Sequence, residues 1–333
     1  IIFRNLNDSS MISLDDVYGG DFKESGKNFI NYVDKKMQDH EKGVNTISGY
    51  LSGYPLLDDI LEGFNKKHYI IIGARAGVGK TTFVLNLMKR FIERNLKIGF
   101  FSLEMSRELI AEKYACLCAG IDQKKLSRGL ISSEEFNRLG LMISNYKGSV
   151  VIDDQPNIKV SQLAARAKRM VLGHGVKVIF IDYLSEVKGE GRFSSKQEEI
   201  QYVSKGIRAI AKTLNIPIIC IAQLNRENEK ANRMPIKSDL RESGQIEADA
   251  YSIMLLHRPE TENINDQPGK MILRIVKNRL GRETDIDFSF DGKTGDIQEL
   301  GYHKKSLSSA GNGFANTGVT NLPYDPYAEK VEE

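Results

Sequence analysis

The residues 73 to 82, GARAGVGKTT, have the types and the spacing of a phosphate-binding loop. They fit the pattern G-x-x-x-x-G-K-[ST] if Ala74 takes the place of the first glycine. In such a loop, successive backbone N–H groups surround a phosphate. Lys80 would then reach the β- and γ-phosphates of a nucleotide, and the Thr81 hydroxyl would ligate Mg²⁺. The stretch therefore predicts nucleotide binding.

The sequence on both sides of the loop favours this interpretation. The apolar run YIII ends at Ile72, and apolar residues with helical spacing follow the loop at Phe83, Leu87, Met88 and Phe91. A helix there would turn its positive end toward the anion. An ordinary glycine-rich turn is the alternative, although the pattern would match by chance in only about a few per cent of chains this long.

Two glycines of the loop have a predicted role in its shape. Gly77 and Gly79 would allow the close approach to phosphate and the unusual backbone angles that a tight turn needs. The residues predicted to bind the nucleotide are Ala76, Gly77, Val78, Gly79, Lys80, Thr81 and Thr82.

Two acidic residues at strand ends compete for the Mg²⁺. Asp153 follows the apolar run SVVI and Asp182 follows VIFI, and periodicity does not choose between them. Ligands of parallel sheets collect at the carboxyl ends of the strands. We favour Asp182 because it leads into a long loop, a helix and the strand PIICIAQ, so that the metal and a polar sensor would lie on successive strands.

Two further polar residues end apolar runs. Glu104 ends FFSLE, where a carboxylate would orient or deprotonate the attacking water. The alternative, equally compatible with the sequence, is a carboxylate that faces the positive end of the following helix. Gln223 ends IICIAQ and would hydrogen-bond a γ-phosphate or a water, with a plain strand-end amide as the alternative.

The elements that must position these residues alternate along the chain. Strands are predicted at 69 to 72, 97 to 102, 149 to 153, 176 to 181, 217 to 222 and 252 to 256, and helices at 106 to 119, 161 to 172 and 197 to 214. This alternation predicts an α/β fold with a mostly parallel, twisted sheet flanked by helices. Strands 270 to 277 and 284 to 290, joined around Leu280 and Gly281, are predicted as an antiparallel hairpin at the far edge.

The two ends of the chain differ from this pattern. Residues 1 to about 20 are predicted to be irregular, and 22 to 40 to form a helix with an apolar stripe that docks on its own domain or on a neighbouring subunit. The sequence after about residue 304 is rich in Ser, Gly, Asn and Pro and predicts a flexible tail. The expected organisation is an arm and linker helix at 1–45, a motor domain at 46–303 and the tail at 304–333.

Composition sets limits on function. The 47 basic and 44 acidic residues leave a net charge of only +3, so any surface for nucleic acid must be local. Eight basic residues against three acidic ones between 205 and 241 would line a channel, or form a solvated face: Lys205, Arg208, Lys212, Arg226, Lys230, Arg233, Lys237 and Arg241 against Glu227, Glu229 and Asp239.

Cysteine use and hydropathy bear on location. Three cysteines without a disulfide framework suggest a reducing cytoplasm, and no apolar run reaches the ~20 residues of a membrane span. The chain begins at Ile1 rather than Met, so we expect sequence upstream of it.

Several blocks carry a family resemblance. Behind GARAGVGKTT, in this order, come FFSLEM (100 to 105), VIFIDYLSEV (178 to 187), IAQLNR (221 to 226), SDLRESGQIEADA (238 to 250) and VKNRLG (276 to 281). Together they resemble the RecA-like motor domain of DnaB-type hexameric replicative helicases of bacteria and phages, from about Gly53 to about Gly292. FSLEM and DLRESG discriminate best, because phosphate loops occur in many families. Ala76 stands where the family often has proline, which leaves the phosphate chemistry intact.

The resemblance implies roles for five residues. The family's water-activating glutamate corresponds to Glu104, its Mg²⁺ aspartate to Asp182 and its γ-phosphate sensor to Gln223. Lys277 and Arg279 correspond to a lysine and an arginine finger that reach the ATP of a neighbouring subunit. Without the resemblance, these two residues would be exposed hairpin charges.

The resemblance also implies partners. Central-channel loops bind DNA in the family, which points to Arg241, Glu242 and Gly244. A basic side chain and a backbone N–H beside glycine suit a phosphate, whereas Glu242 would brace Arg241. The implied partners are single-stranded or forked DNA, further copies in a homohexamer, a helicase loader and primase. Primase contact is in question because the family's N-terminal helical domain is not among these residues.

The expected function is that of an ATP-driven, Mg²⁺-dependent DNA helicase whose ring translocates 5′ to 3′ in the cytoplasm of a bacterial cell or of a phage host. One alternative is a recombinase-like filament ATPase, which would coat DNA rather than unwind it. Another is a nucleotide-binding ring without motor activity, although such a ring would not need Lys80, Glu104 and the two predicted finger residues together.

Overall fold

The computed structural model of the chain describes residues 21–146, 150–224, 233–240, 244–259 and 269–302, and the backbone alone at 3–4, 11–12 and 243. The predicted flexible tail and most of the predicted irregular arm lie outside the described residues. The described chain divides into two compact units, one ending at Thr46 and the other beginning at Ile47. Each unit is described by itself.

The first unit contains a long helix with an uncovered apolar face. Helix α2 (Phe22–Glu41) begins at Asp21, whose carboxylate accepts a hydrogen bond from the Lys23 amide at 3.1 Å. The helix prediction at 22 to 40 is confirmed. None of its residues is buried, and Phe29 and Ile30 are each more than 60% exposed. Two short strands, β1 (Phe3–Arg4) and β2 (Met11–Ile12), pair antiparallel within the predicted arm.

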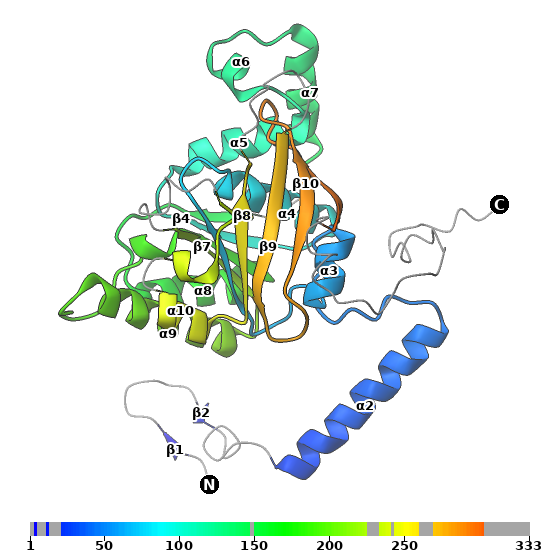
Figure 1. The fold of residues 1–333 in the computed structure, drawn as a ribbon, viewed down its shortest axis with the longest axis vertical. Helices are drawn as coiled ribbons and strands as arrows, with labels where there is room; N and C mark the ends of the chain where they lie inside the picture. The colour runs from blue at the N-terminus through cyan, green and yellow to red at the C-terminus, as the bar shows by residue number, and fades with distance from the viewer. Residues whose placement is uncertain are drawn as a thin grey trace. The chain divides into compact units, whose positions relative to one another are not determined.

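Within its described residues, the second unit is built on a nine-stranded sheet in the order β11-β10-β9-β8-β3-β7-β6-β4-β5 (Figure 1). The strands from β3 to β8 are mutually parallel, as the alternation predicts. These six are β3 (Tyr69–Ala74), β4 (Ile98–Ser102), β5 (Val150–Asp153), β6 (Val178–Asp182), β7 (Ile218–Gln223) and β8 (Ser252–His257).

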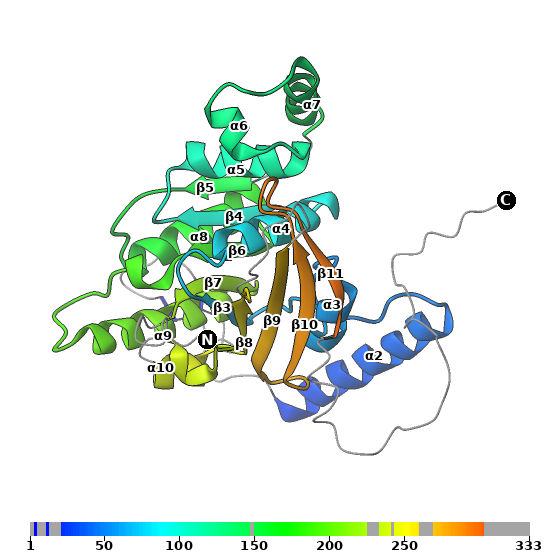
Figure 2. The same cartoon turned by 45° about the horizontal axis from the view of Figure 1, so that its top comes forward.

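Three antiparallel strands complete the sheet and run side by side (Figure 2): β9 (Gly269–Asn278), β10 (Thr284–Phe290) and β11 (Ile297–Tyr302). The predicted hairpin is therefore present as β9 and β10, but it is not at the edge, because β11 pairs with β10 beyond it. The stretch IQELGY contains no strand signal, since its solvent-facing residues, such as Gln298 and Leu300, interrupt any apolar run.

Helices cover both faces of the sheet because strand side chains alternate in direction. Ile70 and Ile72 of β3 pack in one core with α3 (Pro55–Leu61), α4 (Lys80–Glu93) and α5 (Arg107–Ala119). Tyr69 and Ile71 face the other core with α8 (Val160–His174), α9 (Lys196–Leu214) and α10 (Ser243–Asp249). Helices α6 (Gln123–Ser127) and α7 (Ser133–Ser144) lie against the free side of α5, at the top of Figure 1. Two short 3-10 turns, η1 (Leu184–Glu186) and η3 (Lys237–Asp239), follow β6 and precede α10.

A buried asparagine joins α4 to the turn between β10 and β11. The Asn86 amide nitrogen donates to the carbonyls of Gly295 at 2.8 Å and Thr82 at 2.9 Å, and its oxygen accepts the Ile297 amide at 3.1 Å. Asn86 is only 1% exposed. This single side chain therefore fixes the helix that follows the loop against the last strand of the sheet.

We predict that Asn86→Ala lowers the free energy of unfolding by about 3 kcal/mol, because it leaves buried backbone groups without partners. Urea unfolding followed by circular dichroism measures the change. Asn137→Ala, at an exposed position of α7, is the matched control and should shift the midpoint little. Equal midpoints for the two variants would show that Asn86 does not join these elements.

Candidate functional site

The loop GARAGVGKTT lies between β3 and α4, as its flanking sequence predicts. Gly77 and Gly79 have φ angles of +75° and +108°, a region that residues with a side chain rarely adopt. The Lys80 ammonium donates to the carbonyls of Ala74 and Arg75, each at 3.3 Å. Burial lowers the pKa of Lys80, and the charges of Asp182 and Glu104 oppose this shift. The lysine is thus held over the loop by the loop's own backbone.

Asp182 reaches the first turn of α4 from the end of β6. The Thr81 hydroxyl donates to its carboxylate at 2.8 Å. Asp182 is 2% exposed, and burial raises its pKa to about 6. The hydrogen bond from Thr81 and the charge of Lys80 oppose this rise, while the negative charge of Glu104 adds to it. A carboxylate, a hydroxyl and an ammonium therefore share one small volume at the mouth of the loop.

Asp153, the other aspartate considered for Mg²⁺, lies elsewhere. It ends β5, the edge strand, and pairs with Arg166 of α8 at 2.6 Å. β6 lies between β7 and β4, one strand closer to the loop than β4 and two closer than β5. The structure therefore brings Asp182 to the loop and gives Asp153 a basic partner of its own.

Glu104 and Gln223 also lie at the carboxyl edge of the parallel strands. Glu104 follows β4 with an exposed side chain, close enough for its charge to affect the pKa of both Lys80 and Asp182. Gln223 is the last residue of β7, and its Cα pairs with that of Ala74 in the ladder between β3 and β7. Four side chains from four different segments, Lys80, Glu104, Asp182 and Gln223, thus converge on one end of the sheet.

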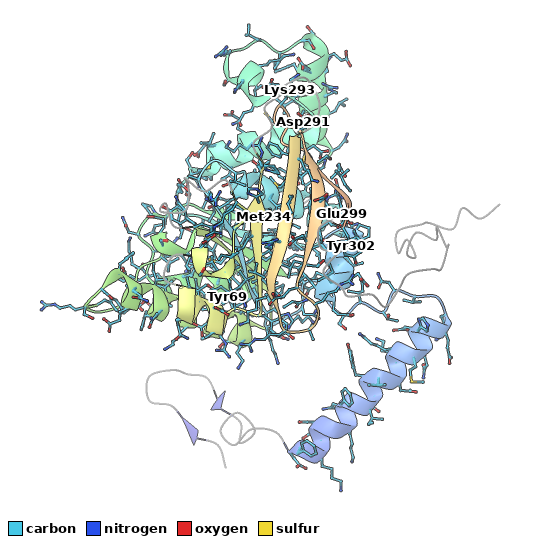
Figure 3. All side chains as sticks on the ribbon, viewed as in Figure 1. Tyr69, Met234, Asp291, Lys293, Glu299 and Tyr302 are labelled. Carbon is cyan, nitrogen blue, oxygen red and sulfur yellow. The ribbon has the colours of Figure 1, made fainter. Side chains whose placement is uncertain are left out.

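Lys277 and Arg279 lie at the opposite end of the sheet. Asn278 at the end of β9 pairs with Ser252 at the start of β8, and Ser252 pairs with Ile70 at the start of β3. Since β3 has six residues, this end is about 20 Å from the loop along the strands. In Figure 3, Tyr69 marks this end and Asp291 marks the end nearer the loop. The two predicted finger residues therefore do not join the loop of their own chain.

The side chains of both finger residues contact α10. The Lys277 ammonium donates to the Glu247 carbonyl, and the Arg279 guanidinium donates to the Ala248 carbonyl at 2.8 Å. Sequence reasoning missed a neighbouring stack of His68 on Tyr251, with ring centroids 3.4 Å apart. Burial, followed by the charge of Arg279, lowers the pKa of His68 to about 4. No motif indicated this stack, because its members come together only through the pairing of β3 with β8.

The predicted DNA-contacting residues are only partly described. Arg241 and Glu242 lie outside the described residues, and Gly244 is exposed in the first turn of α10. Of the eight basic residues between 205 and 241, Arg226, Lys230 and Arg241 also lie outside. Three of the others make ion pairs: Arg208 with Asp249 at 3.3 Å, Arg233 with Asp239 at 2.7 Å and Lys237 with Glu247 at 3.2 Å. The local basic excess is thus largely balanced by acids of the same chain.

Searches for membrane and metal features add two findings. No helix among the described residues has both the length and the apolar composition of a membrane span. Over the same residues, no group of three His, Cys, Asp or Glu side chains could hold a metal ion by itself. A Mg²⁺ that arrives with a nucleotide takes most of its ligands from phosphates and water instead.

Comparison with known proteins identifies clear similarity over this unit. The sequence model of the DnaB-like helicase C-terminal domain matches residues 49–299. The chain is 36% identical over 241 residues to a protein named replicative DNA helicase DnaB in Rickettsia typhi, which covers 68% of this chain and 48% of the relative. For the protein of the same name in Geobacillus stearothermophilus, the values are 33% over 250 residues, 73% and 55%. The chain thus spans about half the length of the curated relatives it matches.

Two solved structures have the same fold. One is an ATPase domain solved by itself, which superposes with a TM-score of 0.75 at 25% identity, covering 84% of this chain and 99% of that one. The other is a DnaB-like replicative helicase, described together with its interactions with primase, which superposes with a TM-score of 0.72 at 26% identity, covering 81% and 66%. The mostly parallel sheet flanked by helices therefore matches the ATPase domains of DnaB-like helicases.

We predict that Asp182→Asn stabilises the protein in the absence of nucleotide and metal. The folded-state pKa of about 6 lies above the ordinary value of 3.8, so the fold disfavours the charged form. This penalty is absent below about pH 4, grows up to pH 6 and is complete above it. At pH 8 the asparagine should raise the free energy of unfolding by up to about 3 kcal/mol, with a smaller gain at pH 5.

Denaturant unfolding at the two pH values measures this difference. Asp153→Asn is the control and should give no gain at either pH, because it removes the ion pair with Arg166. A loss of stability in Asp182→Asn at pH 8 would contradict the assignment of a carboxylate that is kept charged against its surroundings.

Proposed function

This chain belongs to the family of DnaB-like helicase C-terminal domains, and from this premise we propose that it is the ATP-hydrolysing motor of a replicative DNA helicase. The observation that carries the proposal is the hydrogen bond between the Thr81 hydroxyl and the buried Asp182 carboxylate. It joins the phosphate-binding loop to the end of β6, which is the arrangement that Mg²⁺-dependent hydrolysis of ATP requires.

Mg²⁺ fits the pair formed by Thr81 and Asp182. Hydroxyl and carboxylate oxygens are the hard ligands that this ion prefers. Burial disfavours the charge on Asp182, so a cation beside it would relieve an unfavourable state of the folded chain. Bound there, the ion would supply Lewis-acid stabilisation of the phosphate oxygens.

The other residues at the mouth of the loop divide the remaining tasks. The backbone N–H groups of residues 76 to 82 surround the phosphates, and Lys80 exchanges its contacts with the loop carbonyls for phosphate oxygens. Glu104 accepts a proton from the attacking water, a task suited to an exposed carboxylate at a strand end. Gln223 hydrogen-bonds the γ-phosphate or that water from the end of β7.

Lys277 and Arg279 complete the site of a neighbouring subunit in this proposal. Their position at the far end of the sheet supports it, since about 20 Å separates them from their own loop. A finger residue stabilises charge on the transferred phosphoryl group and contributes to turnover rather than to nucleotide binding. Each chain would then hold an incomplete site, which assembly into a ring completes.

A homohexameric ring around single-stranded DNA follows from the same proposal. Helix α2 has no buried residue and an apolar face, and α7 exposes Phe136, Leu141 and Ile143, so each chain offers two apolar surfaces that a second copy could cover. Gly244, with Arg241 and Glu242 beside it, is assigned to DNA phosphates. Translocation 5′ to 3′, a helicase loader and primase are assigned by family, as is the cytoplasm of a bacterial cell or phage host.

The domain limits are part of the proposal. Residues 1–45 are assigned to an arm and linker helix, 46–303 to the motor and 304–333 to a tail. The division of the described chain after Thr46 supports the first of these limits.

We predict that ATP turnover per subunit rises with protein concentration and with single-stranded DNA, because sites are completed between subunits. Lys80→Ala should lower turnover by about a hundredfold or more, while Glu104→Gln should bind ATP and lower turnover about as much. Phosphate release and filter binding measure the two properties. Turnover that depends on neither concentration nor DNA would indicate a self-contained nucleotidase and remove the helicase assignment.

We also predict that Arg279→Ala lowers DNA-stimulated turnover by about a thousandfold with unchanged nucleotide affinity, as expected of a finger residue. Arg282→Ala is the matched control, since Arg282 lies on the same turn and packs over the Tyr302 ring at 4.9 Å. It should leave turnover within about twofold, as exposed substitutions usually do. Steady-state kinetics of both variants would contradict the finger role if they were equally active.

A further inference from the structure

Helix α10 has an unusual set of partners at its C-terminal end. The carbonyls of the last turn of a helix have no partner within the helix and carry a partial negative charge. Here, two successive carbonyls of that turn accept the side chains of Lys277 and Arg279. Both predicted finger residues are therefore held by the same few atoms, on an element that is remote in sequence from β9.

The Glu247 side chain adds a charge to this arrangement. Its carboxylate lies 3.2 Å from the Lys237 ammonium of η3. It also acts on Lys277, since burial and the charge of Arg279 lower the pKa of Lys277 while Glu247 raises it. Glu247 thus faces two cations, one from the segment before α10 and one from β9, and compensates charge that the fold brings together.

The position of α10 is itself fixed at both ends. At its C-terminal end, the Arg208 guanidinium of α9 pairs with Asp249 at 3.3 Å, where the aspartate side chain is only 2% exposed. Before its N-terminal end, Leu240 is buried and forms a bridge with Leu224, the residue after Gln223. The helix therefore runs from the nucleotide end of the sheet to the end that carries the finger residues.

We propose that the C-terminal end of α10 is the positioning element for the two finger residues, with Glu247 as its principal side chain. The inference rests on the proposed role of Lys277 and Arg279 at the neighbouring subunit's nucleotide. The Glu247 and Ala248 carbonyls fix where the two cations stand. An arginine carries five N–H donors, so one can bond to Ala248 while others meet a phosphate.

One consequence is a mechanical link through a single short helix. Gly244, an assigned DNA contact, lies in the first turn of α10, and the finger contacts lie at its last turn. A seven-residue helix is about 10 Å long and moves as a rigid rod. A displacement of its first turn by DNA would therefore move both cations relative to the next subunit's site.

The test uses two complementary variants that are each inactive alone. Lys80→Ala chains keep their finger residues but lose their own loop, and Arg279→Ala chains keep the loop but lack the arginine. When they are mixed with single-stranded DNA, ATP can be hydrolysed only where the fingers of the first meet the loop of the second. Single-turnover hydrolysis in the mixture measures those sites without requiring the ring to cycle.

Glu247→Gln is then added to one partner at a time. In the Lys80→Ala chain, which donates the fingers, it should lower the single-turnover rate constant about tenfold with unchanged nucleotide affinity, because a misplaced catalytic group affects the rate. In the Arg279→Ala chain, which owns the site, the rate should stay within about twofold. Retained activity in this second placement also shows that the substitution does not unfold the protein.

Two further variants of the finger donor refine the result. Glu283→Gln loses an ion pair with Lys237, 3.7 Å long, without touching α10, and should leave the recovered rate unchanged. Glu247→Asp keeps the charge and should restore most of the rate. Equal losses in both placements, or no loss in either, would overturn the positioning role. If the two parent variants recover no hydrolysis when mixed, the proposed trans role of Arg279 is wrong, and this inference is removed with it.

Discussion

A buried carboxylate at the end of a parallel strand is the constraint on which this structure depends. Asp182 is almost completely covered by the fold, yet its only direct hydrogen-bond donor among the described side chains is the Thr81 hydroxyl. Burial pushes its pKa upward, toward the neutral form. A fold that keeps such a group beside Lys80 accepts a less stable resting state, and a phosphate-bound cation would reverse that balance. The site is thus organised around a charge that the protein alone does not neutralise.

The direction of the strands decides where everything else lies. Six parallel strands present their carboxyl ends at one edge of the sheet, which gathers Lys80, Glu104, Asp182 and Gln223. The antiparallel strand β9 returns to the other edge and carries Lys277 and Arg279 there. A sheet that separates the two sets by its own length gives each chain a donor end and an acceptor end, which suits closed rings of identical subunits.

The short helix α10 connects these two ends. Its approach is fixed by the bridge of Leu240 to Leu224, and its exit by Arg208 with Asp249. Between them, the helix offers its last carbonyls to cations from a distant strand. Ion pairs that look like surface charge in the sequence therefore serve as supports: Arg208, Arg233 and Lys237 each have an acidic partner on the same chain.

The sequence by itself determined what depends on neighbouring residues: the strand, loop and helix around GARAGVGKTT, the positive φ angles of Gly77 and Gly79, and the parallel core strands. It did not decide between Asp153 and Asp182 from their local pattern, because both end apolar runs; that choice came from the family resemblance, and the geometry depends on the order of strands in the sheet. Likewise β11, a half-exposed edge strand, has no apolar run to reveal it. Only the tertiary structure brought Glu247 to Lys277, thirty residues away in sequence, because contacts between distant residues arise from strand pairing and helix packing rather than from local propensity.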